Sequence, residues 1–212
     1  MVRSRRIAWA LLAAVAVLAG TAAQAADKDV KIGVVDVQKI YKDAPRVKQY
    51  MEDLDKFRDG LKQKLETRQQ NMMLSEDEIK ELIDLKLKQT ATQPEKDRIT
   101  ALEKTERDRD AELKTLQEGK DLNDQQKARL KELQEMQQKS KDTGAAIAKD
   151  YDGQFQTKVQ ETESIITGEL QDAIKKVAEG KGYTLVLDKV VVLSGGTDIT
   201  DDVIGKLDRK MK

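Results

Sequence analysis

The spacing of apolar and polar positions divides the chain into three kinds of segment. Residues 7–19 contain no charged side chain, and short β-branched runs occur near residue 30 and again after residue 180. Between these runs, apolar residues recur every three or four positions. Compact β-branched runs are typical of strands, whereas the longer repeat is typical of amphipathic helices. We therefore expect β structure at both ends of a long helical section.

Three strands are predicted from the β-branched runs. They cover residues 30–37, 183–187 and 190–193, and Asp188 and Lys189 alone separate the second from the third. A two-residue link of this kind suits a hairpin.

A short helix is predicted at the C-terminal end, after the Ser-Gly-Gly break at 194–196. Residues 198–200 supply an N-cap, Asp201 and Asp202 follow in the first turn, and basic residues lie at the end of the chain, an order that complements the helix dipole. Its apolar face is formed by Val203, Ile204 and Leu207.

The helical section carries a narrow apolar stripe, which predicts a helix that packs along one partner. The stripe of its first half consists of Val47, Tyr50, Leu54, Phe57, Leu61, Leu65, Arg68 and Met72. A second helix is predicted from about residue 124 to residue 178, which is about 80 Å at 1.5 Å per residue. Polar and small residues such as Gln137, Ser140 and Gly144 interrupt its stripe, so we expect it to bend easily.

Three cap-like breaks punctuate the helical section, and one of them must reverse the chain. Ser75 and Thr92 each precede a glutamate by three positions, and Gly119 is followed by a cap at Asn123. A reversal at residues 119–123 gives two limbs of comparable length, so we favour it, with residues 75–91 as a kinked or laterally packed helix. Reversal at Ser75 or Thr92 remains the alternative.

The N-terminal segment has the order of a secretory signal peptide. Three arginines precede the uncharged run, and Ala23-Gln24-Ala25 forms an A-x-A cleavage site. An uncleaved anchor is the alternative, but thirteen apolar residues are short against the roughly 20 that span a bilayer. Cleavage after Ala25 would export to the periplasm a chain with 36 basic and 39 acidic residues, a formal charge of −3.

The composition excludes several classes of protein. The chain has neither Cys nor His, which removes thiol chemistry, the usual general base and the commonest metal ligands, and its 39 basic and 39 acidic residues argue against nucleic acid as a partner. Asp36 and Asp188 could share a cation, but carboxylates at the ends of strands are more often solvated. Gly195-Gly196 could suggest a phosphate-binding loop, but it lacks the Lys-Ser/Thr that such a loop requires. We expect no enzyme, no cofactor and no metal.

The two β regions are too small to fold by themselves. We assign residues 1–25 to the signal peptide, 26–45 and 179–212 to a β body, and 46–178 to a helical arm. A core of this size without disulfides or metal supplies only about 3 to 5 kcal/mol, and a three-stranded sheet has edges that need covering. We therefore expect an α+β fold in which strands of several subunits form a small β-barrel-like body and each subunit extends a long antiparallel helical hairpin as an arm. The predicted interface consists of Ile32, Val34, Val35, Leu185, Val186, Leu187, Val191 and Val192.

The segments 31–41 (KIGVVDVQKIY), 182–188 (GYTLVLD) and 198–204 (DITDDVI), placed around one long charged helical section, resemble the periplasmic chaperone Skp (OmpH-like) family. The resemblance implies a homotrimer whose three arms enclose a cavity, and an ATP-independent holdase that keeps unfolded outer-membrane proteins from aggregating. Transient contact with the membrane surface is compatible with this role. The chain departs from the family in its longer helical section and its slightly acidic charge.

One apolar cluster of the arm is a candidate for client binding. It comprises Met72, Met73, Leu74, Ile79, Leu82 and Ile83. The alternative is that these residues pack the kinked helix against its neighbour. A different function, a structural coiled-coil spacer or adaptor of the cell envelope, would need no client contact at all.

Overall fold

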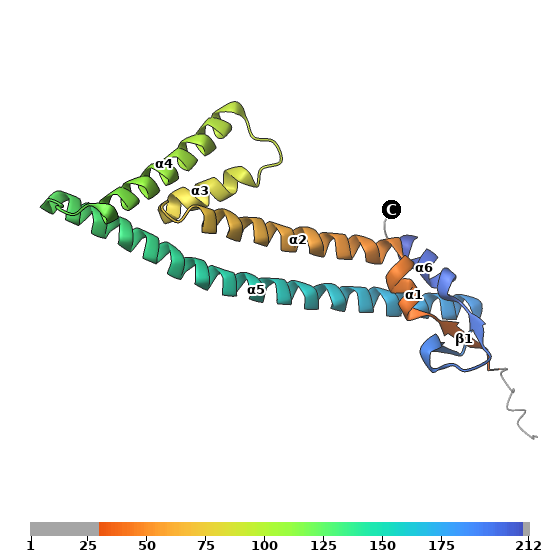
Figure 1. The fold of residues 1–212 in the computed structure, drawn as a ribbon. Helices are drawn as coiled ribbons and strands as arrows, with labels where there is room; N and C mark the ends of the chain where they lie inside the picture. The colour runs from red at the N-terminus through yellow and green to blue at the C-terminus, as the bar shows by residue number, and fades with distance from the viewer. Residues whose placement is uncertain (1–29, 210–212) are drawn as a thin grey trace, which may run out of the picture.

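The computed structural model describes residues 30–209, so the predicted signal peptide lies outside the described residues. Within this range the molecule is elongated, with a small body at one end and a long helical arm (Figure 1). The helix α5, Asp124–Lys181, runs along nearly the whole molecule (Figure 1).

The body contains a three-stranded sheet in which both neighbours of the central strand are parallel to it. β1 (Ile32–Val35) lies between β2 (Leu185–Asp188) and β3 (Thr197–Asp198), and Ile32 is paired with Leu185. Parallel neighbours require a crossover connection. Here the entire arm is the crossover between β1 and β2, which explains why strands from the two ends of the described chain meet.

The first strand is shorter than predicted because Asp36 ends it. The Asp36 carboxylate accepts a hydrogen bond from the Lys39 amide at 2.8 Å and caps the helix α1, Val37–Asp43. Residues 36 and 37, which the β-branched pattern places in the strand, therefore lie at the start of a helix.

The predicted hairpin between residues 183–187 and 190–193 is wrong. The Asp188 carboxylate accepts a hydrogen bond from the Val190 amide at 3.2 Å, which starts a 3₁₀ turn, η1 (Lys189–Val191), in place of a strand. Gly195 and Gly196 follow with φ values of 89° and 83°. These left-handed conformations bring the chain back to the free side of β1, where β3 forms.

The core of the body lies where the sheet, α1, the root of the arm and the last helix meet. That helix, α6 (Thr200–Asp208), packs against α5 and α1. The buried cluster consists of Val35, Ile40, Ala44, Val47, Ile166, Leu170, Ala173, Val177, Ile199, Val203 and Leu207. The described residues thus form an open three-stranded sheet packed against helices, and they do not show a barrel built from several chains.

The arm is an antiparallel pair of helices over its inner part. α2, Pro45–Gln70, leaves the body with Pro45 in its first turn and packs along α5. α5 continues to Lys181, three residues beyond the predicted end, and Gly182 caps it in the left-handed conformation with φ 71°.

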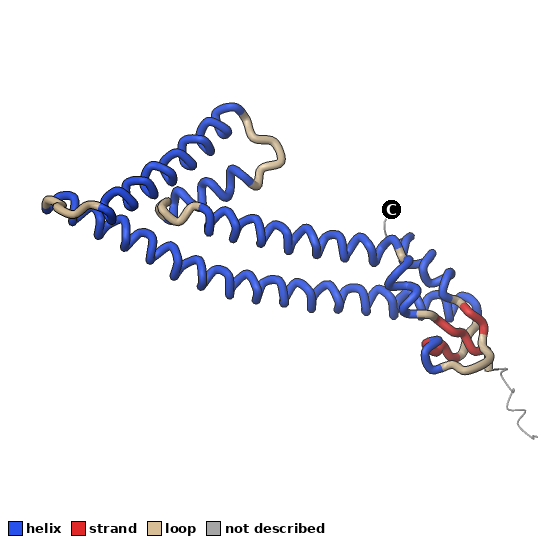
Figure 2. Tube along the Cα trace, in the orientation of Figure 1, coloured by secondary structure: helices blue, strands red, loops and turns tan. Residues whose placement is uncertain are grey.

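The outer part of the arm carries a side branch formed by α3 (Glu76–Lys86) and α4 (Gln93–Glu118). α3 folds back beside α4, and the far end of α4 joins α5 through residues 119–123 (Figure 2). The chain turns back at all three breaks, and the final turn, from which α5 returns to the body, lies at the favoured position (Figure 2). Asn123 caps α5 there by accepting a hydrogen bond from the Gln126 amide at 2.9 Å. The outgoing limb is broken into three helices because Ser75 and Thr92 start new helices with their own capping boxes.

Candidate functional site

The structure places the six predicted client-binding residues at the base of the side branch, mostly in its interior. Four are at most 1% exposed, namely Met73, Leu74, Ile79 and Leu82. The half-buried ones are Met72 and Ile83. Leu74, Ile79 and Leu82 pack inside the branch and Met73 packs between the branch and α5, so a client could reach these side chains only if the helices around them separated.

These buried residues belong to two separate clusters. The first lies between α3 and α4 and contains Leu74, Ile79, Leu82, Leu85 and Leu102. The second joins the branch to α5 and contains Met73, Leu113, Leu116 and Leu133. A branch with its own core and a second contact to α5 forms a defined unit of the arm.

Polar groups of α4 clamp the loop that enters the branch. Glu106 accepts a hydrogen bond from the Met73 amide at 2.8 Å, and Arg109 donates to the Met73 carbonyl at 3.0 Å and to Glu78 at 2.7 Å. Burial raises the pKa of Glu106. Burial also acts to raise the pKa of Glu78, but hydrogen bonds from Arg109 and Ser75 outweigh it and lower that pKa.

A buried arginine connects α2 to α3 at the same place. Arg68 is 3% exposed and forms an ion pair with Glu76, while its Nε has no hydrogen-bond partner. The Ser140 hydroxyl of α5 is also buried without a partner. Both residues border a hollow of about 270 Å³ that is otherwise lined by residues including Met72, Gly144 and Ala148. The side chains of α2 and α5 therefore do not completely fill the space between the two helices where the branch begins.

Between this junction and the body, the arm has no buried residue on α5. Ser140 and Thr162 are buried, and every residue from 141 to 161 is exposed or half-buried. This stretch is about 31 Å long at 1.5 Å per residue. Its half-buried apolar residues are Ile147, Ala148, Tyr151, Phe155 and Val159.

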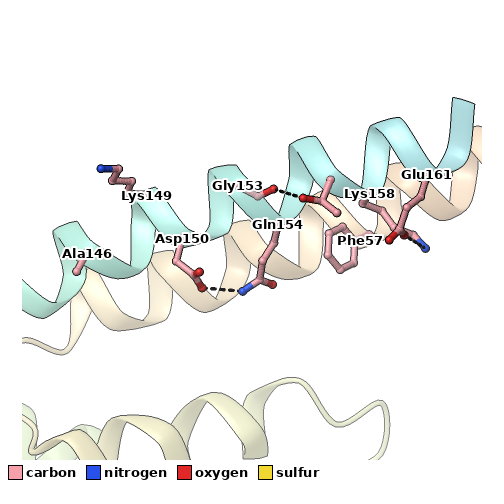
Figure 3. A pocket seen from close by; sticks show the side chains of 9 residues that line it. Phe57, Ala146, Lys149, Asp150, Gly153, Gln154, Lys158 and Glu161 are labelled. Atoms are coloured by element: carbon pink, nitrogen blue, oxygen red, sulfur yellow. Dashed lines mark hydrogen bonds and ion pairs between the residues drawn. The ribbon is translucent and has the colours of Figure 1, made fainter.

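An open groove of about 800 Å³ lies in this middle part of the arm. Phe57 of α2 and residues of α5 from Ala146 to Glu161 line it. Figure 3 shows the Phe57 ring beside α5, with Asp150 and Gln154 on the same side and Lys149 pointing away. The stripe pattern assigned Phe57 to helix packing, and only the incomplete burial of the mid-arm distinguishes it from a core residue.

The root of the arm is fixed to the body by one polar cluster. Arg46 of α2 forms an ion pair with Glu169 of α5 at 3.1 Å and donates a hydrogen bond to the Tyr50 hydroxyl at 2.5 Å. The Arg46 amide also donates to Asp208 of α6 at 3.2 Å. The hydrogen bond to Glu169 raises the pKa of Arg46. This contact among three helices lies beside the apolar core, to which α2 and α5 also contribute, and both tie the arm to the body.

The predicted interface residues divide between the interior of the folded chain and its surface. Val34 and Val35 are buried within the single chain, at 7% and 3% exposed. Leu185 and Val191 are exposed, and Ile32, Val186, Leu187 and Val192 are half-buried. Two exposed residues missed by the sequence reasoning join them, Val190 at 74% and Leu193 at 105%. The β2 edge and the segment after it thus present an apolar surface.

The carboxylates considered for a cation have other partners. Asp36 caps α1 and forms an ion pair with Lys189 at 3.2 Å, and these contacts lower its pKa. Asp188 caps η1. Among residues 30–209, no group of three carboxylates is arranged to hold a metal ion, and no helix is both long and apolar enough to cross a membrane.

Comparison with known proteins identifies the chain at the level of a family. Residues 83–207, more than half of the chain, match the family described as Outer membrane protein (OmpH-like). The match begins inside α3 and includes α4, α5 and the C-terminal part of the body. No curated protein and no solved structure matches. The chain therefore belongs to the OmpH-like family, whose members have a periplasmic, chaperone-type role.

Proposed function

We propose that this protein is an ATP-independent periplasmic holdase that binds unfolded outer-membrane proteins between its helical arms and prevents their aggregation. The observation that carries the proposal is the mid-arm, where α5 has no buried residue from 141 to 161 and keeps half-buried apolar side chains. Unfolded chains that expose apolar strands are held best by many weak contacts along an extended surface, and charged residues beside those contacts keep the complex soluble.

Assembly of several copies supports this proposal. The exposed apolar residues after β2, above all Val190, Val191 and Leu193, need a cover, and the edge of a three-stranded sheet pairs readily with another strand. We expect three copies to join these edges in a common body, so that three arms extend from it. Mass measurement in solution should give three times the mass of one subunit, whereas a stable monomer would contradict this assembly.

Suppression of aggregation tests the function itself. A urea-unfolded outer-membrane protein is diluted into buffer with and without the purified protein, and light scattering is followed without nucleotide. We expect scattering to fall as the protein approaches equimolar amounts of trimer and client. A coiled-coil spacer or adaptor would leave scattering unchanged, and that result would reject the holdase.

A further inference from the structure

We propose that the groove at Phe57 is the segment-binding site of the arm and that it takes one extended, net-neutral stretch of unfolded polypeptide. The proposal rests on the holdase function and assigns its contact site. It places contact in the mid-arm, away from the side chains that form the interior of the branch.

The length of the groove matches an extended segment. Its lining on α5 runs from Ala146 to Glu161, which is about 22 Å at 1.5 Å per residue. An extended chain advances about 3.3 Å per residue, so about seven residues fit along it. Such a length corresponds to one strand of an unfolded β protein.

The apolar surface of the groove comes from Phe57, Ala146 and Gly153, which lie among six polar or charged lining residues. The Phe57 ring is its aromatic group, and an added Cβ at Gly153 would meet no heavy atom within 4 Å, so the surface of α5 is open there. Two polar side chains of the lining are already engaged within α5. Gln154 donates to Asp150 at 2.7 Å, and Thr157 donates to the Gly153 carbonyl at 3.0 Å (Figure 3). Apolar contact without fixed hydrogen-bond partners tolerates many sequences.

The charges of the groove select the class of segment. The lining carries two basic residues, Lys149 and Lys158, and two acidic ones, Asp150 and Glu161, so its formal charges sum to zero, although the Lys149 side chain points away from Phe57 (Figure 3). Lys158 and Glu161 are 3.8 Å apart and offset each other. A lining without net charge does not attract a strongly charged ligand. A segment that alternates apolar and neutral polar residues can bind without such attraction. Binding should therefore depend little on ionic strength.

The test compares Phe57→Ser with Met51→Ser and Phe57→Leu in the full-length oligomer. Met51 is 38% exposed on the same helix and does not line the groove, so it is the matched control. Affinity for a fluorescently labelled, urea-unfolded outer-membrane protein is measured by titration. We expect Phe57→Ser to weaken binding about fivefold, and Met51→Ser and Phe57→Leu to change it by less than about twofold. Circular dichroism and solution mass verify that each variant keeps its helices and assembly.

The outcomes separate this inference from the proposed function. Equal affinity of Phe57→Ser and the wild type, with scattering still suppressed, would overturn the groove and leave the holdase intact. If the wild type fails to suppress scattering, the proposed function itself fails. A change of solution mass in Phe57→Ser would make the groove an interface between copies and overturn the assignment. A loss of affinity above about tenfold between about 50 and about 500 mM salt would contradict a neutral segment.

Discussion

At the scale of single residues, Gly196 determines how the chain returns to the sheet. Its φ of 83° lies in the left-handed region, and an added Cβ would lie 2.4 Å from the Val34 side chain. Gly195 has a similar φ of 89° but open space around it. The two adjacent glycines therefore share the same backbone requirement and differ in the available space.

Replacing Gly196 by Ala should destabilise the body by about 2 to 4 kcal/mol, because backbone strain adds to a clash with Val34. Gly195→Ala should cost only about 1 kcal/mol, since strain acts alone. Urea unfolding of both variants measures the difference. Equal losses for the two variants would show that the Val34 contact has no role.

The unpartnered hydroxyl of Ser140 gives a second prediction at this scale. Ser140→Ala should raise the free energy of unfolding by about 1 kcal/mol, because it removes a buried polar group without a partner and introduces a better helix former. The measurement is urea unfolding followed by circular dichroism. Exposed Ser164 on the same helix is the control, and Ser164→Ala should change stability by no more than about 0.5 kcal/mol. Destabilisation by Ser140→Ala would indicate that the hydroxyl does have a partner.

At the scale of elements, the side branch is a helical hairpin with its own core and its own ion pairs. Arg98 of α4 forms an ion pair with Glu81 of α3 at 2.6 Å, and Lys86 does so with Glu103 at 2.7 Å. Each of these partly exposed pairs contributes little by itself. The buried leucines between the two helices therefore provide most of the stability of the branch.

Leu82→Ala should cost about 2 to 5 kcal/mol and act mainly on the branch, because Leu82 is fully buried between α3 and α4. Hydrogen exchange should become faster in α3 and in the adjoining half of α4, while the amides of β1 and α6 keep their protection. The matched variant Leu207→Ala should produce the reverse pattern, since Leu207 belongs to the core of the body. Faster exchange in the body of Leu82→Ala would show that the branch is not an independent unit.

At the scale of the whole molecule, the parallel pairing of β1 with β2 places the root of the arm and the apolar surface at the β2 edge on the same small body. The arm connects β1 to β2, so both ends of the arm are anchored in the same sheet. The residues that follow β2 expose valine and leucine to solvent in the isolated subunit. The body therefore serves two roles in the proposal, as the root of one arm and as the surface that joins copies.

Replacing Val190 and Val191 together by Asp should convert the assembly to monomers, because charge would enter an apolar interface. The two residues are 74% and 68% exposed, so the fold of the subunit should be unaffected. Sedimentation analysis measures the mass, and circular dichroism measures the helix content. Leu87→Asp, on the branch at 36% exposed, is the control and should retain the assembly. An unchanged mass for the valine variant would place the interface elsewhere.

The sequence alone predicted the elements whose signals are local. Capping residues at Ser75, Thr92 and Asn123 are adjacent to the helices that they start, so these helix starts and the reversal of the arm could be inferred from spacing. The short strand after residue 183 and the last helix also have local signals. The β-branched run at 190–193 was misleading, because the Asp188 side chain stabilises a turn there.

The tertiary structure decided what each apolar stripe packs against and which strands pair. An apolar stripe has the same spacing whether it packs tightly or loosely, so the pattern could not separate the buried Leu82 from the half-buried Phe57. Nor could it show that both strands beside β1 are parallel to it, since strand direction depends on the path of the whole arm. Local backbone signals lie within a few residues of one another and can be read from the chain. Burial and strand pairing join residues that are distant in the sequence, such as Leu82 with Leu102 in the branch or Ile32 with Leu185 in the sheet, and are fixed only by packing.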